Sequence, residues 1–287
     1  MPLVTNPGAF WYNQFMRDKR IGVFDSGFGG LNTLKSIVRA LPAYDYLYLG
    51  DAARAPYGGR SQKAIYQFTR QAVDFLFRNN CELIVVACNT ASSEALRKIQ
   101  REYLPKHYPG RRVLGVLIPA AEVAAQKTRN NRIGVMATQA TVGSRAFIRE
   151  AGKLGPRIRV FQKACPLLVP IVEAGQQDAA STKRILQSYL APLTKQKIDT
   201  LILGCTHYGI LEKQIKRIVG RKTMVVSEAE AVPKNLKAYL KKHKEIETKL
   251  RKNRTVQFYT TGFAGRFKTL GSKFFGQNIN VTKVKIS

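Results

Sequence analysis

Two cysteines follow two apolar runs and could act together on one substrate. Cys88 comes after the run 83–87, and Cys205 comes after the run 201–204. Small polar residues and an amphipathic segment follow each cysteine. A short apolar run that leads into a helix is typical of a buried parallel strand. Open α/β sheets bind their ligands at the carboxyl ends of the strands, so the pattern predicts one site with a thiol on either side.

Two thiols on opposite sides of a pocket suit the inversion of a carbon that bears an acidic C–H. One base removes the proton from one face while an acid delivers a proton to the other face. One sulfur must therefore be a thiolate and its partner a thiol. Because each cysteine stands at a helix start, we expect the pKa of both thiols to fall below about 8.5. Nucleophilic attack by one cysteine, or a redox disulfide, explains only one sulfur or requires the two to touch.

The remaining cysteines, Cys81 and Cys165, are expected to be small core residues. The chain has four cysteines in 287 residues and no CxxC pair. Neither a disulfide framework nor a structural zinc site is indicated by this usage. Free thiols are typical of a reducing compartment, so we expect a cytoplasmic protein without a bound metal.

A glycine-rich turn precedes the first expected helix. Residues 25–30 read DSGFGG, between the apolar run 21–24 and the helical pattern 31–38. Unobstructed backbone N–H groups at a helix start favour an anion. The dinucleotide fingerprint GxGxxG would need glycine where Asn32 stands, which disfavours a nicotinamide or flavin site. We therefore expect a small anionic ligand.

The sequence pattern repeats once along the chain. Ile133, in a segment that resembles residues 20–26, lies 112 residues after Ile21, and Cys205 lies 117 residues after Cys88. Similar offsets indicate a duplicated α/β unit. We predict an α/β protein of two pseudo-symmetric flavodoxin-like domains with parallel sheets and the site in the cleft between them. The predicted domains are residues 1–112 plus 225–287, and residues 113–224.

The charge of the chain is strongly positive. There are 48 Lys and Arg against 18 Asp and Glu, a formal net charge of +30, which is typical of proteins that bind nucleic acid or another polyanion. No aromatic residue alternates with the basic residues of segment 241–244, as a base-stacking platform requires. We therefore favour a solvated basic surface, and nucleic acid stays open as a partner without being favoured.

Membrane insertion is not expected. The longest apolar runs, such as 83–87, are far shorter than the roughly 20 residues that a membrane span requires. Residues 1–20 lack the basic start and continuous apolar stretch of a signal peptide, and we interpret them as an extension ahead of the first strand.

Four motifs in the same order resemble those of glutamate racemase. They are DSGFGGL at 25–31, GD at 50–51 with APYG at 55–58, ACNTAS at 87–92, and GCTHY at 204–208. The resemblance runs from about residue 21 to the end of the chain. It implies two α/β domains, inversion of glutamate without a cofactor, and supply of D-glutamate for peptidoglycan. Glutamate would be the small-molecule substrate, and a homodimer stays open.

The resemblance also assigns roles to residues. Cys88 would be the base toward D-glutamate and Cys205 the base toward L-glutamate. Asp25 would assist Cys88, while His207 together with Glu173 would assist Cys205. The residues that would hold the substrate are Asp25, Ser26, Tyr57, Gly58, Asn89, Thr90, Thr138, Thr141, Thr206 and His207.

The sequence departs from the family pattern at three places. Gly209 stands where proline usually follows CTHY, Ala120 stands where glycine is usual, and residues 227–229 read Ser-Glu-Ala instead of an Asp-Ser-Ala type. These positions lie outside the proposed acid/base pair, so they bear on local loop shape. The alternatives are another racemase of the superfamily, for aspartate or hydantoin, and a basic nucleic-acid-associated protein on the same scaffold.

Overall fold

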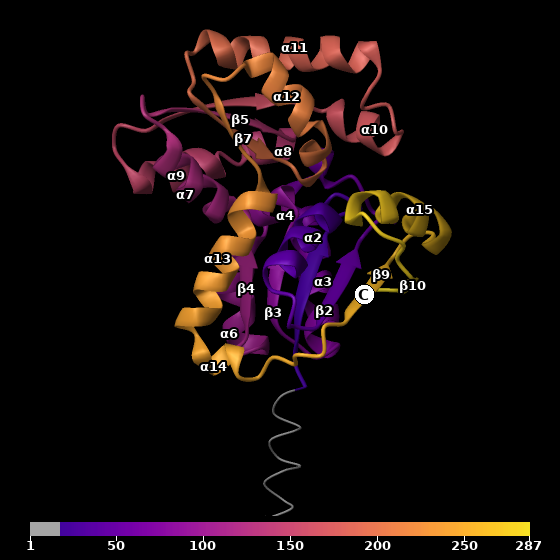
Figure 1. Ribbon diagram of the computed structural model, residues 1–287. Helices are drawn as coiled ribbons and strands as arrows, with labels where there is room; N and C mark the ends of the chain where they lie inside the picture. The colour runs from indigo at the N-terminus through magenta and orange to yellow at the C-terminus, as the bar shows by residue number, and fades with distance from the viewer. Residues whose placement is uncertain (1–17) are drawn as a thin grey trace, which may run out of the picture.

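Two parallel β-sheets, each covered by helices, form the two lobes of the protein (Figure 1). The structure is a computed structural model and describes residues 18–287. Most of the predicted N-terminal extension, residues 1–17, lies outside the described residues. The α/β fold with parallel sheets that the sequence predicts is confirmed.

The first sheet has the order β10-β9-β2-β1-β3-β4 and the second the order β6-β5-β7-β8. The strands of the first sheet are β1 (Arg20–Asp25), β2 (Tyr46–Gly50), β3 (Cys81–Val86), β4 (Arg112–Gly115), β9 (Val256–Thr260) and β10 (Val281–Lys283). Those of the second are β5 (Arg132–Ala137), β6 (Arg159–Ala164), β7 (Thr200–Gly204) and β8 (Met224–Val226). All residues of β2, β3 and β7 are buried, as expected for strands covered on both faces.

The same strand order occurs in both lobes. Strands β2-β1-β3-β4 of the first sheet correspond to β6-β5-β7-β8 of the second. Because β3 and β7 hold equivalent places, the cysteines that follow them, Cys88 and Cys205, also stand at equivalent places. This topology agrees with the repeat in the sequence.

The helices of the first lobe lie around its sheet. They are α2 (Gly30–Ala40), α3 (Gln62–Arg78), α4 (Asn89–Glu94), α5 (Leu96–Lys98), α6 (Leu104–His107), α13 (Glu228–Lys242), α14 (Lys244–Glu247) and α15 (Ala264–Phe275), with a 3₁₀ turn η1 (Tyr57–Gly59) and a π-helical segment η2 (Ile99–Tyr103). Those of the second lobe are α7 (Leu117–Lys127), α8 (Gln139–Gly143), α9 (Ala146–Leu154), α10 (Leu168–Glu173), α11 (Ala180–Lys195) and α12 (Glu212–Val219), with the 3₁₀ segment η3 (Thr206–Leu211).

The chain passes between the lobes twice, after β4 and after β8. Strand β4 pairs with β3, so the first sheet extends to Gly115, although residue 113 was predicted to open the second domain. Strand β8 pairs with β7 in the second sheet, and its last two residues lie beyond the predicted boundary at 224/225. The division into domains as a whole stays a prediction. After β8, helix α13 returns to the first lobe and packs on both α2 and α7 (Figure 1).

Three segments differ from the sequence prediction. Residues 164–173 were expected to form an apolar loop, but they contain helix α10. The helical region expected from Pro233 begins at Glu228 instead, because Pro233 lies inside the helix rather than at its start. Strand β10 was not predicted, since its three residues give too short a pattern.

Within residues 18–287, none of the helices combines the length and the apolar character that crossing a membrane would require.

Close packing at Gly50, the last residue of β2, gives a first prediction. A Cβ on Gly50 would lie 2.5 Å from Phe267 Cε2 and 2.8 Å from the Gly27 carbonyl oxygen. We expect Gly50→Ala to lower the free energy of unfolding by about 1–3 kcal/mol, the usual cost of overpacking, measured by urea denaturation. Gly59→Ala is the control, because a Cβ there meets no atom within 4 Å. Equal stability of the two variants would contradict the packing argument.

Candidate active site

A cavity of about 210 Å³ receives side chains from both lobes. Cys88 and Cys205 both line it. The predicted site residues that line it with them are Ser26, Tyr57, Gly58, Asn89, Thr90, Thr138, Glu173, Thr206 and His207. The other two predicted residues, Asp25 and Thr141, are fully buried behind the cavity wall.

Cys88 stands at the N-terminus of α4, immediately after the first-lobe strand β3. Its side chain is 5% exposed. The sulfur accepts the backbone N–H of Ala91 at 3.5 Å and lies 3.4 Å from Ser26 Oγ. A backbone N–H and a hydroxyl can both stabilise a thiolate at this position.

Cys205 occupies the equivalent place in the second lobe, between β7 and η3. His207 Nδ1 lies 3.9 Å from its sulfur. The other ring nitrogen, His207 Nε2, lies 3.1 Å from Glu173 Oε1, and Glu173 ends helix α10. A carboxylate at this distance fixes the orientation of the ring. The geometry therefore places the second ring nitrogen of His207, Nδ1, next to the sulfur of Cys205.

Burial raises the pKa of both thiols. The pKa of Cys88 rises from 9.0 to about 12, first because of burial and second because of the Asp25 carboxylate. Burial also raises the pKa of Cys205 well above 9.0, while the backbone N–H of His207 opposes the rise. The expectation that a helix start lowers both pKa values is therefore wrong for the cavity as it stands, because removal from water outweighs the helix terminus.

Asp25, the last residue of β1, supports the site from behind. Its carboxylate accepts the Gly27 N–H at 2.9 Å and the Thr206 hydroxyl at 3.3 Å. Burial raises the pKa of Asp25, and the nearby His207 opposes this. The side chain in direct hydrogen-bond contact with Cys88 is that of the neighbouring Ser26, whereas Asp25 contacts Thr206 in the lobe of Cys205.

Three threonine hydroxyls from both lobes meet at the other side of the cavity. Thr90 Oγ1 lies 2.9 Å from Thr138 Oγ1 and 3.4 Å from Thr141 Oγ1. Thr138 donates to Thr141 at 3.0 Å. Gly58 packs against this cluster, since a Cβ there would lie 2.8 Å from Thr138 Cβ. These hydroxyls can donate or accept, so they suit an anionic group of a substrate.

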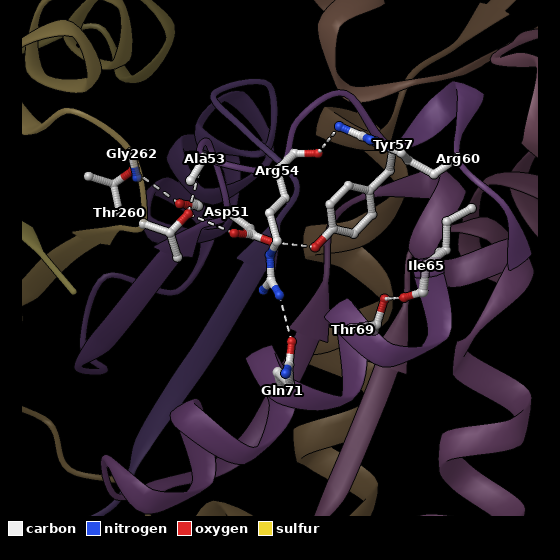
Figure 2. Close-up of polar contacts among 12 residues, drawn as sticks. Asp51, Ala53, Arg54, Tyr57, Arg60, Ile65, Thr69, Gln71, Thr260 and Gly262 are labelled. Carbon is white, nitrogen blue, oxygen red and sulfur yellow. Dashed lines mark hydrogen bonds and ion pairs between the residues drawn. The ribbon is translucent and has the colours of Figure 1, made fainter. Parts of the chain in front are cut away.

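Asp51 holds the loop that carries Arg54 and Tyr57 (Figure 2). Tyr57 donates to Asp51 Oδ2 at 2.5 Å, and Arg54 Nε donates to the same oxygen at 2.7 Å. Thr261 donates to Asp51 Oδ1 at 2.6 Å. The carboxylate is buried and has three charge-assisted or hydroxyl partners, which is the arrangement that makes a buried charge tolerable.

Several residues at the site were not assigned to it from the sequence. Cys165 was expected to be a core residue, and it is fully buried, but it also lines the cavity. Gln139 and Val169 line the cavity as well. The internal repeat offers a signal for Cys165. Cys165 directly follows β6, and Asp51, which belongs to one of the four motifs, directly follows the equivalent strand β2. Within residues 18–287, no group of three or more His, Cys, Asp or Glu side chains is arranged to hold a metal ion.

Comparison with known proteins agrees with this geometry. The sequence matches the Asp/Glu/Hydantoin racemase family over residues 21–232. The chain belongs to this family. The resemblance identified from the four motifs is thereby confirmed, and the protein is an amino-acid racemase, an isomerase.

The relatives of this racemase are glutamate racemases. The protein of Chlorobaculum tepidum is 45% identical over 75% of this chain and 77% of its own length. That of Oceanobacillus iheyensis is 37% identical over 94% of this chain and 98% of its own. For two solved glutamate racemases, the alignment covers 94% of this chain and 98% of the solved chain. An isoform from Bacillus anthracis has a TM-score of 0.86 at 36% identity. The Francisella tularensis enzyme, solved in complex with D-glutamate, has a TM-score of 0.84 at 31% identity.

The contact between Tyr57 and Asp51 predicts the effect of removing one hydroxyl. Tyr57→Phe leaves the buried carboxylate with one donor fewer, so we expect a loss of about 2 kcal/mol in the free energy of unfolding, measured in guanidinium. Tyr66→Phe is the control, because the ring face of Tyr66 meets Lys98 Nζ and that contact survives the change. Equal losses for both variants would show that the hydroxyl of Tyr57 contributes nothing.

The raised pKa of Asp25 predicts how stability changes with pH. The folded protein holds this proton more tightly than the unfolded chain, whose value is 3.8. The contribution of Asp25 to stability therefore falls as pH rises above 3.8 through the folded pKa, and it stays lower beyond. Asp25→Asn removes this loss, so we expect it to be more stable relative to the wild type at pH 8 than at pH 4. At pH 4 the difference should be small. Urea unfolding at the two pH values measures it, and an equal difference at both would contradict the assignment.

Proposed function

We propose that the protein interconverts L- and D-glutamate, with Cys88 and Cys205 as the acid/base pair and without a cofactor. The observation that carries the proposal is that both sulfurs line one cavity, at equivalent strand ends of the two lobes. An inversion needs one proton carrier on each face of the reacting carbon. The names of the relatives and the printed D-glutamate complex support glutamate as the substrate.

The proton balance of the reaction follows from two sulfurs in different states. In the L-to-D direction the Cys205 thiolate takes the Cα proton, and the Cys88 thiol delivers its proton to the opposite face. The enzyme is then left with a Cys205 thiol and a Cys88 thiolate, which is the state needed to start from D-glutamate. His207, hydrogen-bonded to Glu173, would assist proton exchange at Cys205.

Substrate binding would lower the raised pKa of the thiols. An ammonium group close to both sulfurs favours a thiolate, because an opposite charge within about 4–6 Å lowers the pKa of an acid. The same ammonium group would neutralise the field of the buried Asp25 carboxylate, which raises the pKa of Cys88. The reactive state would therefore form together with the substrate complex.

The carboxylates of glutamate would be held by neutral donors. No Lys or Arg is among the described residues that line the cavity, so hydroxyl and backbone N–H groups must bind the anion. The hydroxyls of Thr90 and Thr138, with Thr141 in contact behind them, would receive the carboxylate of the side chain, and Thr206 lies next to Cys205. Aspartate, one methylene shorter, would not span the same distance.

We further propose that the product serves peptidoglycan synthesis in the cytoplasm. D-Glutamate is the product that the resemblance to glutamate racemases implies for cell-wall assembly. All four cysteines are free thiols and all are buried, which supports a reducing compartment.

Incubation with one enantiomer in heavy water tests the reaction. We expect the optical rotation of L-glutamate to decay to zero without pyridoxal phosphate, with deuterium at Cα of the newly formed D-glutamate. Cys88→Ala and Cys205→Ala should each lower kcat/KM in both directions by about 10²–10⁴ or more, the usual contribution of a general acid or base.

Cys81→Ala is the matched control for these variants. Cys81 is equally buried and lies on the strand that leads to Cys88, but it does not line the cavity. We expect it to retain kcat/KM within about threefold, since core truncation acts on stability. Ordinary turnover by either Cys88→Ala or Cys205→Ala would refute the two-base mechanism. Turnover of aspartate or a hydantoin in place of glutamate would assign the protein to a sister activity.

A further inference from the structure

Glu228 is a buried carboxylate that none of the steps above uses. It is the first residue of α13, at the point where the chain leaves β8 of the second lobe, and it is 4% exposed. Its two oxygens contact two elements of the first lobe. Oε1 accepts a hydrogen bond from Asn89 Nδ2, and Oε2 accepts one from Thr33 Oγ1 at 3.1 Å.

Asn89 connects this carboxylate to the site. It directly follows Cys88, lines the cavity and is 2% exposed. The carboxamide gives its Nδ2 to Glu228, while its Oδ1 is buried and has no hydrogen-bond partner among the described residues. A buried acceptor without a donor is destabilising, because it has lost its hydrogen bonds to water. The ammonium group of an amino acid is a donor that could satisfy it.

The chemistry of the two groups determines which end of the amide stays free. Glu228 Oε1 accepts the hydrogen bond from Asn89 Nδ2 both when the carboxyl is ionised and when it carries its proton on Oε2, so it selects the nitrogen end of Asn89. Without this partner the carboxamide could turn over and present Nδ2 in place of Oδ1. Glu228 thereby controls whether Asn89 offers an acceptor or a donor next to Cys88.

The fold keeps Glu228 buried at a cost. Burial raises the pKa of the Glu228 carboxyl to about 8. The hydrogen bonds from Asn89 and Thr33 oppose this rise, whereas the charge of Asp25 adds to it. The charge of Glu228 also raises the pKa of Cys205.

We propose that Glu228 is a positioning residue, which orients the Asn89 carboxamide and keeps Asn89 Oδ1 available to a donor on the substrate. The role rests on the proposed racemisation of glutamate. Glu228 touches neither the reacting atoms nor the cavity that holds them, and it acts through Asn89. The contact also joins the start of α13 to α4, so a purely structural role makes different predictions and can be separated by experiment.

A double-mutant cycle on kcat/KM for glutamate tests the proposal. Asn89→Ala removes the amide, Glu228→Ala removes its partner, and the double variant removes both. We expect Glu228→Ala to lower kcat/KM about tenfold or more, since misplacing one binding group has effects of this order. In the Asn89→Ala background the same change should have no further effect, because residues that act as a unit are not additive. Losses that multiply in the double variant would overturn the proposal.

Two further variants separate positioning from folding. Glu228→Gln can still place an oxygen on Asn89 Nδ2, so we expect it to retain kcat/KM within about threefold. It also keeps the test informative if Glu228→Ala fails to fold. Glu230→Ala is the control on the same helical turn, because Glu230 pairs with Lys127 at the surface and should leave kcat/KM unchanged. A loss with Glu228→Gln equal to that with Glu228→Ala would contradict an oxygen-mediated role.

The wild-type measurement distinguishes the two levels of the argument. An inactive wild type overturns the proposed function and the role of Glu228 with it. An active wild type whose Glu228→Ala variant keeps full kcat/KM overturns only the positioning role. Because the two enantiomers of glutamate have equal free energy, kcat/KM must fall equally in both directions for every variant, and this equality checks the data.

Discussion

Removal of ionisable groups from water is the constraint on which this site depends. Asp25, Cys88, Cys205 and Glu228 are all nearly or fully buried within the region where the lobes meet. For each of them, burial is the largest cause of a pKa raised above its ordinary value. An acid/base pair in such surroundings stays neutral until a compensating charge arrives. In the proposed reaction, the reactive thiolate would form only together with the bound substrate, which avoids a thiolate exposed to oxidants.

The duplicated architecture supports the proposal of two proton carriers at one carbon. Equivalent strands of two similar sheets lead into Cys88 and Cys205, and both cysteines line one cavity. The partners of the two sulfurs differ, however. Cys88 has a serine hydroxyl and a backbone N–H, whereas Cys205 has a histidine paired with a glutamate. The symmetry therefore concerns the backbone positions of the two cysteines, whereas the groups that contact their sulfurs differ.

Much of this arrangement could be read from the sequence, since apolar runs followed by Cys88 and Cys205 are local patterns. The family resemblance named the residues around them, and the structure brings all of these but Asp25 and Thr141 to the cavity surface. The pKa values could not be predicted, because burial arises from the whole fold while a helix start is visible locally. The contact between Asn89 and Glu228 was equally out of reach, since it joins residues 139 positions apart. Helix α10 was missed because Pro170 masked a short helix that depends on packing.

The three threonine hydroxyls have a consequence for how both mirror forms are accommodated. Thr90 belongs to one lobe and Thr138 and Thr141 to the other, and all three are uncharged rotors whose hydrogens can turn at little cost. In the proposed reaction the far end of the substrate stays attached to this group while only the stereocentre changes hand. Both enantiomers of glutamate would then be held by the same group of hydroxyls. Since this group of hydroxyls comes from both lobes, either enantiomer bound there would tie the two halves of the protein together.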